Sequence, residues 1–530
     1  MNVPVQSERS GHLAGDGAAS AENHQVVIIG SGISGIGAAI RLQQSGVRDF
    51  VMLERGQDVG GTWRDNRYPG AACDVPGLLY AYSFTRVPTW SASLPSAEEI
   101  FGYLRRCVAD HGLEDHLHFG SEVTEARWSD EESRWHVVAG GRQYSSRFLI
   151  VATGLFSKPK VPDLPGLDSF AGATFHTTEW DLSYDVTGKK VALIGTGASA
   201  VQCVPHFAAS AQSLDVYQRT PAWVLPRMER RIRPFEWALY QRRPRLRRLV
   251  RAVAFHVRES WALCFSGLLH RVVASGVAAL ARLHLRCRIA DRNLRRRLTP
   301  SYRLGCKRVL LSNDYYPALR RGNVSLVTDS IARFTPDGVV TEDGVDRPAD
   351  ILVFGTGFTV DRPPIARCIA GRGGKRLSDV WNQGMTAHHN ITVPGFPNMF
   401  MLLGPNTGTG HTSATLVLEA QLGYILDCLD QMRRHNLSDV DVLPQVQQKF
   451  SERLHSRMRR TVWLSGGCGS WYLDARTGRN TTLWPGSVRD YRSEVRSFRL
   501  AEYRVRGDGS GVSPASSDGA GHGAGAGRVR

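Results

Sequence analysis

The sequence lacks cysteines at any spacing that would form a redox dithiol or a zinc site. Its nine cysteines are scattered, and the closest two, Cys287 and Cys306, are 19 positions apart. Because neither CxxC nor CxxxxC occurs, redox catalysis by a cysteine dithiol is excluded and no metal site is predicted. An odd number of separated cysteines predicts reduced thiols in a cytoplasmic protein.

Long apolar runs are also missing. No apolar stretch follows Met1, so a secretory leader is not predicted. The longest apolar stretch, 261–281, is interrupted by His270 and Arg271, which makes it too polar for a membrane-spanning helix. We therefore expect a cytoplasmic protein.

Acidic residues are scarce in one segment. Residues 227–308 contain 22 basic and 4 acidic side chains, a net +18, while the whole chain carries +17. Because the positive charge is confined to this segment, it characterises the surface of the segment only, and we predict no nucleic-acid partner. Apolar residues recur there at helical spacing, for example Leu246, Leu249, Val250 and Val253, which predicts amphipathic helices with arginine-rich faces. Such helices could rest on an anionic membrane, so a peripheral membrane contact through 227–303 is one expectation.

The rest of the 530-residue chain has the composition of a globular protein, with 42% hydrophobic residues. Short β-rich runs that end in glycine predict buried parallel strands; they span 25–30, 148–154, 190–195 and 350–357. The pattern predicts an α/β fold of two nested Rossmann-like dinucleotide-binding domains, with a helical excursion in the second. The expected bounds are a disordered tail at 1–23, a first dinucleotide-binding domain at 24–160 and 351–506, a second one at 161–350 with the helical segment 227–303, and a disordered tail at 507–530.

A glycine-rich turn follows the first predicted strand. It contains Gly30, Gly32 and Gly35 and leads directly into a predicted helix. Glycines here allow a tight turn and a close approach of the backbone to a pyrophosphate at the helix N-terminus. Glu54 lies 24 positions after Gly30, at the end of the next predicted strand, where a carboxylate accepts hydrogen bonds from an unphosphorylated ribose.

A second turn follows the strand at 190–195. It contains Gly195, Gly197, Ser199 and Ala200, with alanine in the third glycine position. Arg219 lies 24 positions after Gly195, the same offset as that of Glu54. A guanidinium binds a ribose 2′-phosphate, whereas a carboxylate would repel it. One acidic and one basic site therefore predict FAD in the first site and NADPH in the second.

A longer motif, FAGATFHTTEWD, spans 170–181 immediately before the second turn. Phe170, Gly172, His176 and Trp180 have the spacing F-x-G-x-x-x-H-x-x-x-W. This resembles the identifying motif of type I Baeyer–Villiger monooxygenases, within the class B flavoprotein monooxygenases. Further similarity extends over 60–74, 305–319 and 465–486. We interpret His176 as a structural residue bonded to backbone.

The resemblance implies roles for particular residues. Expected FAD contacts are Glu54, Thr62, Trp63, Asp74, Tyr80 and Val123. Expected NADP contacts are Arg219, Thr220 and Lys307 for the phosphate, with Gln202 and Trp471 as weaker candidates. Asp74 and Arg308 correspond to the catalytic acid and arginine beside the flavin. The segment 404–413 resembles the start of a flavin-facing helix. The glycine-rich loop with Trp471 resembles a loop that closes over the site.

The resemblance also implies an activity. NADPH would reduce FAD, O₂ would form a C4a-peroxyflavin, and this would convert a ketone to an ester or lactone, with Arg308 supplying a fixed positive charge. Two alternatives stay open. One is a flavin monooxygenase that oxygenates sulfides or amines, and the other is a basic surface-binding protein with a vestigial nucleotide fold. The substrate and the oligomeric state are not predicted.

Overall fold

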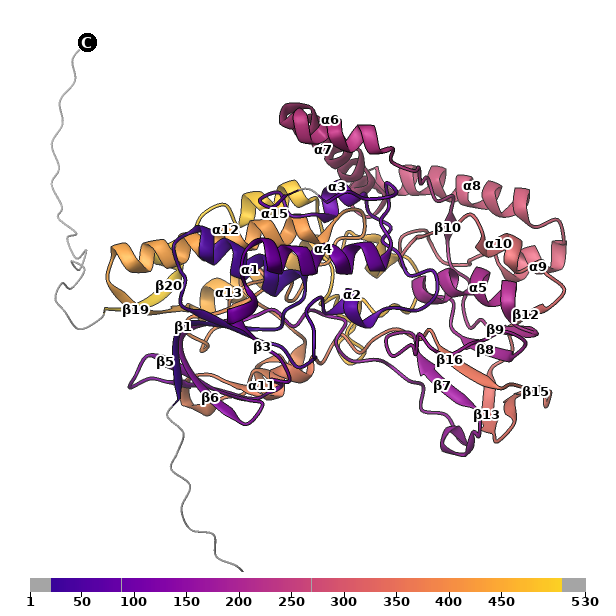
Figure 1. The fold of residues 1–530 in the computed structure, drawn as a ribbon, viewed down its shortest axis with the longest axis horizontal. Helices are drawn as coiled ribbons and strands as arrows, with labels where there is room; N and C mark the ends of the chain where they lie inside the picture. The colour runs from indigo at the N-terminus through magenta and orange to yellow at the C-terminus, as the bar shows by residue number, and fades with distance from the viewer. Residues whose placement is uncertain (1–20, 87, 268, 508–530) are drawn as a thin grey trace, which may run out of the picture.

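The computed structural model of the chain describes residues 21–86, 88–267 and 269–507 (Figure 1). The first strand begins at Glu22 and the last ends at Gly507, so residues 22, 23 and 507 belong to strands rather than to the predicted tails. The other tail residues, apart from residue 21, lie outside the described residues.

The first sheet has its strands in the order β17-β4-β5-β6-β1-β2-β3, with β18 added beside β6. Its strands are β1 (Glu22–Ile29), β2 (Phe50–Leu53), β3 (Leu117–His118), β4 (Val123–Ser129), β5 (Arg134–Ala139), β6 (Arg142–Val151), β17 (Ile369–Ala370) and β18 (Met399–Met401). Val26 and Ile28 of β1 pack into one core, and Val27 and Ile29 into another, because successive side chains alternate between the faces of a strand. The central strand is therefore buried on both faces, as its continuous apolar run predicts.

Helices from distant parts of the chain cover this sheet. α1 (Ile33–Gln44), α4 (Ala97–Asp110) and α12 (Ala414–Arg434) lie over one face in Figure 1 and contribute to the same core as Val26 and Ile28. The N-terminal and C-terminal parts of the chain thus build one unit, as predicted for a nested arrangement.

The second sheet is parallel throughout, in the order β12-β9-β8-β16-β7. Its strands are β7 (Ala173–His176), β8 (Lys190–Ile194), β9 (Ser213–Tyr217), β12 (Val324–Val327) and β16 (Ile351–Phe354). The predicted boundary at 350 and 351 assigned β16 to the first unit, but β16 pairs with β7 and β8 in the second sheet. The boundary therefore follows Phe354. A buried apolar strand does not specify its partners, so its sequence could not reveal this.

The motif at 170–181 has a structural role. His176 ends β7, is buried, and lies with Nε2 3.1 Å from the carbonyl oxygen of Gly357. Trp180 packs against Phe207 of the second core, with ring centroids 5.4 Å apart. This confirms the interpretation of His176 as a residue bonded to backbone.

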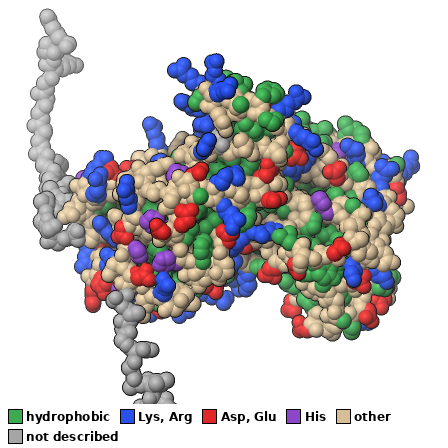
Figure 2. Space-filling model, viewed as in Figure 1, with side chains coloured by type: hydrophobic (Ala, Val, Ile, Leu, Met, Phe, Trp, Pro, Cys, Tyr) green, Lys and Arg blue, Asp and Glu red, His purple; other side chains and the backbone are tan. Residues whose placement is uncertain are grey.

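The basic segment is helical, as predicted. It contains α6 (Pro234–Arg242), α7 (Pro244–Ser260) and α8 (His270–Arg288), the 3₁₀ turn η3 (Trp261–Cys264) and α9 (Arg292–Arg297). Helices α6 and α7 project from the body of the molecule (Figure 1), and arginine and apolar side chains gather on this projection (Figure 2). Leu246 and Val250 pack against the first core, whereas Leu249 and Val253 are 60% and 55% exposed.

Smaller elements complete the fold. The remaining helices are α2 (Thr62–Asp65), α3 (Gly77–Tyr80), α5 (Ala198–Ser210), α10 (Tyr315–Ala318), α11 (Leu377–Val380), α13 (Pro444–Met458), α14 (Val462–Ser465) and α15 (Val488–Glu494). The remaining strands are β10 (Val224–Leu225), β11 (Leu310–Leu311), β13 (Ile331–Thr335), β14 (Gly338–Thr341), β15 (Asp346–Pro348), β19 (Leu437–Val442) and β20 (Tyr503–Gly507). Among the described residues, no helix combines the length and the apolar character needed to cross a membrane.

Candidate functional site

The first glycine turn has the geometry of an anion cradle. Gly30 has a φ of 98°, and a Cβ on Gly35 would lie 1.9 Å from the carbonyl oxygen of Gly30. Only glycine fits either position. α1 begins after Gly32, and no side chain caps its N-terminus. The first N–H groups of α1 therefore face a site that suits a pyrophosphate.

Glu54 lies where the ribose of the first nucleotide is predicted. It follows β2, is buried, and its Oε2 accepts hydrogen bonds of 2.9 Å from the backbone N–H and the hydroxyl of Ser31. Oε1 accepts from Arg64 at 2.8 Å. Burial opposes ionisation, but the hydrogen bonds from Arg64 and the backbone outweigh it and hold the pKa of Glu54 below its usual value. The predicted contact Val123 begins β4, and Ser121, two residues earlier, donates its N–H to the carbonyl oxygen of Glu54.

The second turn repeats the first. Gly195 has a φ of 119°, and a Cβ there would lie 2.5 Å from the carbonyl oxygen of Gly355. α5 begins after Gly197, again without a side-chain cap. Ser199 and Ala200 lie in the first turn of this helix. The second site therefore also suits a pyrophosphate.

Gln202, a predicted nicotinamide contact, joins the two units. Its Oε1 accepts a hydrogen bond of 2.8 Å from the Tyr68 hydroxyl, and its Nε2 donates to the carbonyl oxygen of Ala72 at 3.0 Å. Both polar ends of the side chain are thus engaged with the 60–74 segment.

Positive charge gathers beyond β9, as the sequence predicts. Arg219 is exposed two residues after the strand ends, and Lys307 is half-buried close to it. Burial and then the charge of Arg219 lower the pKa of Lys307. The carbonyl oxygen of Thr220 accepts a hydrogen bond of 2.8 Å from Thr196 of the glycine turn. A dianionic phosphate bound between these two cations would be attracted to both and would relieve their mutual repulsion.

Three predicted flavin contacts lie in the short helices α2 and α3. Thr62 begins α2 and is exposed, and Trp63 follows it. The Trp63 indole N–H donates to the Tyr80 hydroxyl at 2.9 Å, and the two rings meet edge to face. The structure therefore brings Trp63 and Tyr80 together.

Arg308 and Asp74 form a bidentate ion pair at the centre of the site. Nη2 of Arg308 lies 2.7 Å from both carboxylate oxygens of Asp74, and Nε lies 3.1 Å from Oδ2. The charge of Asp74 raises the pKa of Arg308, and the charge of Arg308 outweighs burial to lower the pKa of Asp74. Arg308 is nevertheless 38% exposed, so its fixed positive charge is accessible.

A cleft opens beside this pair. It is lined by Asp74, Val75, Arg258, Trp261, Phe265, Arg308, Val309, Leu311, Thr409, Gly410, His411 and Thr412. Residues 409–412 immediately precede α12, whose N-cap Ser413 accepts from the N–H of Thr415 at 3.2 Å. The predicted flavin-facing segment 404–413 thus contributes to the same cleft as Arg308.

Sequence reasoning missed Arg258. This residue of α7 donates to the carbonyl oxygen of Asp74 at 3.3 Å, and its guanidinium lies 5.6 Å from the Trp261 ring centroid. Burial lowers its pKa. The only sequence signal was its membership of a segment with 22 basic residues, most of which face solvent, so nothing distinguished it from its neighbours.

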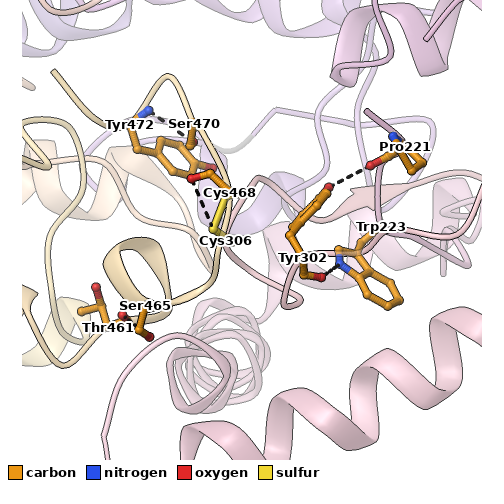
Figure 3. Close-up of a disulfide and its surroundings, with 9 residues drawn as sticks. All are labelled: Pro221, Trp223, Tyr302, Cys306, Thr461, Ser465, Cys468, Ser470 and Tyr472. Carbon is orange, nitrogen blue, oxygen red and sulfur yellow. Dashed lines mark hydrogen bonds between the residues drawn. A yellow bond between two sulfur atoms is a disulfide. The ribbon is translucent and has the colours of Figure 1, made fainter. Parts of the chain in front are cut away.

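Two of the cysteines form a disulfide, so the prediction of reduced thiols throughout was wrong. Cys306 and Cys468 are bonded across 162 positions (Figure 3). Spacing along the chain cannot reveal a contact of that range. The bond joins the segment that carries Lys307 and Arg308 to the glycine-rich loop that carries Trp471. Trp471 is 41% exposed and meets Phe156 edge to face, with ring centroids 5.6 Å apart.

The protein has close relatives among known sequences. A family model described as Pyridine nucleotide-disulphide oxidoreductase matches residues 27–258. A Baeyer–Villiger monooxygenase from Streptomyces coelicolor is 44% identical over 485 residues, which are 91% of this chain and 93% of the relative. The chain belongs to the Baeyer–Villiger monooxygenase family. A second Baeyer–Villiger monooxygenase, from Pseudomonas aeruginosa, is 41% identical over 92% of each chain.

Solved structures agree with this assignment. A cyclohexanone monooxygenase from Rhodococcus sp. Phi1 bound to NADP⁺ has a TM-score of 0.82 and 27% identity, covering 92% of this chain and 100% of that one. OTEMO in complex with FAD and NADP has a TM-score of 0.82 and 26% identity over the same shares. The Baeyer–Villiger monooxygenase resemblance, the α/β fold with two dinucleotide-binding domains and the assignment as a monooxygenase are therefore confirmed.

Proposed function

We propose that this protein is an FAD-containing monooxygenase that uses NADPH and O₂ to convert ketones to esters or lactones. The observation that carries the proposal is the Arg308–Asp74 pair, which holds an accessible positive charge in a cleft beside residues 409–412, just before α12. The bound flavin would supply the oxygen chemistry, and the chain itself supplies placement and charge.

The two nucleotide sites would take different cofactors. The first sheet and its helices, 24–160 and 355–506, would hold FAD through the Gly30–Gly35 turn, with Glu54 on the ribose. The unit at 161–354 would hold NADPH, with Arg219 and Lys307 on the 2′-phosphate. This division is supported by the charges that follow β2 and β9, which are opposite in sign.

Arg308 would stabilise the negative charge that develops during oxygen insertion. A guanidinium suits this task because it stays charged when water is excluded. Asp74 would orient Arg308 through the hydrogen bonds that it accepts from Nε and Nη2, and would balance part of its charge. Trp63 and Tyr80 would pack beside the flavin, and Trp471 would cover the nicotinamide from the loop that the disulfide anchors.

The basic helices expose apolar and arginine side chains that suit the surface of an anionic membrane. We place the protein in the cytoplasm, with the projecting face of α7 resting on anionic lipid. Leu249, Val253 and Val257 lie four positions apart on that face and are each more than half exposed, and the arginines nearby match the charge of such a surface.

Product analysis with purified holoenzyme tests the function. NADPH, O₂ and a panel of cyclic and aryl ketones should give esters or lactones, identified by mass spectrometry. Matched sulfides and amines serve as the comparison. Sulfoxides or N-oxides without an ester from any ketone would support the alternative oxygenase instead, and a colourless protein that oxidises no NADPH would contradict both.

A further inference from the structure

A buried pair of histidines lies apart from the cleft that contains Arg308. His388 and His389 follow one another in the loop before β18, and their side chains are 3% and 7% exposed. Both direct Nε2 at the same carboxylate oxygen of Glu502, at 3.0 Å for His388 and 3.3 Å for His389. The ligand atoms of the three residues all lie within 4.8 Å of one another.

The backbone of this loop brings the two rings together. Consecutive side chains in extended backbone point in opposite directions. Here His389 and Asn390 both adopt left-handed conformations, with φ of 52° and 63°, and the two imidazole centroids lie only 3.8 Å apart. Left-handed backbone is uncommon for residues other than glycine, although asparagine and histidine adopt it more often than most.

The spacing matches a tetrahedral metal ion. Zn²⁺ binds imidazole nitrogen and carboxylate oxygen at about 2.0–2.2 Å, so two ligand atoms on one ion lie about 3.3 Å apart. The two nitrogen–oxygen distances of 3.0 and 3.3 Å are close to this value. Two sides of the ligand triangle therefore already have the length that such an ion requires, and the third is no longer than 4.8 Å.

The surroundings of the His389 ring support the same ion. If both histidines donated from Nε2 to Glu502, each Nδ1 would carry a buried lone pair. Nδ1 of His388 has no hydrogen-bond partner, and Nδ1 of His389 faces the carboxylate of Glu494 at 3.5 Å, where a lone pair would be repelled. A metal on the Nε2 side would leave the proton of His389 on Nδ1, so that this residue turns an N–H towards Glu494. Arg499 contacts the other oxygen of Glu502, at 3.4 Å, and leaves Oε2 to the histidines.

We propose that His388, His389 and Glu502 bind a divalent transition metal ion, with Zn²⁺ as the expected ion and Glu494 as the partner of His389. The site is structural. It connects the loop before β18 to Glu502, the residue before β20, and to Glu494 at the end of α15. The missing CxxC spacing excludes only metal sites built from paired cysteines, whereas the ligands of this site are histidine and glutamate.

The test uses the FAD-loaded enzyme, stripped with a chelator and titrated with ZnCl₂ by calorimetry. All proteins carry Cys287→Ser, since Cys287 is an exposed thiol that could bind zinc. We expect one ion per chain and a higher thermal transition with Zn²⁺. His388→Gln and Glu502→Gln should weaken binding by about tenfold or more. His435→Gln, which changes an exposed histidine, should leave it unchanged.

X-ray absorption spectroscopy of the zinc-loaded parent identifies the atoms bound to the ion, even if a variant fails to fold. Two imidazole nitrogens and oxygen in the first shell, without sulfur, would support the site. Equal binding by His388→Gln and His435→Gln, a sulfur ligand, or no binding by the parent would overturn it. The last result would leave the three residues as an ion-pair cluster only.

Discussion

Opposite charges follow equivalent strands in the two nucleotide-binding units. Glu54 follows β2 and Arg219 lies two residues beyond β9. The shared offset of 24 positions from each glycine turn made both predictable, because strand, turn and helix lengths in this fold are local properties. Arg64 and Arg258 were not predictable. Each acts on a carboxylate or carbonyl group that a different segment supplies, and the residues around each in the sequence do not indicate that partner.

Arg219→Ala should weaken the preference for NADPH. Loss of a charged hydrogen bond to phosphate costs about 1.5–3 kcal/mol, so KM for NADPH should rise by about ten- to a hundredfold while KM for NADH changes little. Steady-state NADPH and NADH oxidation measures this. Arg333→Ala, at an exposed arginine of β13, is the matched control. An unchanged KM ratio in Arg219→Ala would place the phosphate elsewhere.

At the scale of elements, the carboxylate of Glu259 in α7 connects this helix to the cleft and to α15. Glu259 accepts a hydrogen bond from Nε2 of His411 at 2.9 Å and from the N–H groups of Val488 and Arg489, which begin α15, at 3.2 Å each. The sequence predicted α7 as a helix from its apolar spacing. It could not predict this attachment, because the partners lie 152 or more positions away.

Glu259→Gln should destabilise the protein in a pH-dependent way. Burial opposes ionisation, but the bonds from His411 and the backbone lower the pKa of Glu259 below 4.5. A lowered pKa contributes stability above the unfolded-state value, and this contribution is lost as pH falls through the folded-state value. We expect the transition temperature of the variant to lie a few degrees below that of the parent at pH 7, with the gap closing below about pH 4. Scanning calorimetry measures it, with exposed Glu131→Gln as the control. A gap that persists unchanged at low pH would show that the carboxylate charge is not responsible.

The Cys306–Cys468 bond should stabilise the loop around Trp471. Cross-linking a long loop typically contributes about 2–4 kcal/mol by restricting the unfolded chain. Cys468→Ser, or reduction of the parent, should therefore lower the thermal transition, whereas Cys287→Ser should not. Thiol titration in denaturant gives a direct count: seven of the nine cysteines should react before reduction. Nine reactive thiols in freshly isolated protein would contradict the disulfide.

At the scale of the whole molecule, two nucleotide-binding units face one cleft, and a basic helical projection stands beside it. The nested order of the units was predictable from the four glycine-ended strands. The projection was predicted to be helical, but its exposed face depends on which side of α7 packs against the core. Leu246 and Val250 pack there, which leaves Leu249 and Val253 outside.

Vesicle binding tests that exposed face. The parent should sediment with phosphatidylglycerol-containing vesicles and not with neutral ones, and salt should release it. Replacing Leu249, Val253 and Val257 with glutamine should abolish sedimentation. Leu182→Gln, at a leucine that is 65% exposed before β8, is the control. Equal behaviour of the triple variant and the parent would assign the exposed residues another role.

The most direct measurement compares the parent with Arg308→Ala, supplied with NADPH, O₂ and an accepted ketone. Removing one group that stabilises developing charge typically slows a reaction by about 10²–10³-fold. We predict that the variant still consumes NADPH, releases hydrogen peroxide and forms almost no ester, while Arg303→Ala, at an exposed arginine of the same segment, behaves as the parent. Ester formation by Arg308→Ala at the parental rate would contradict the central role of Arg308.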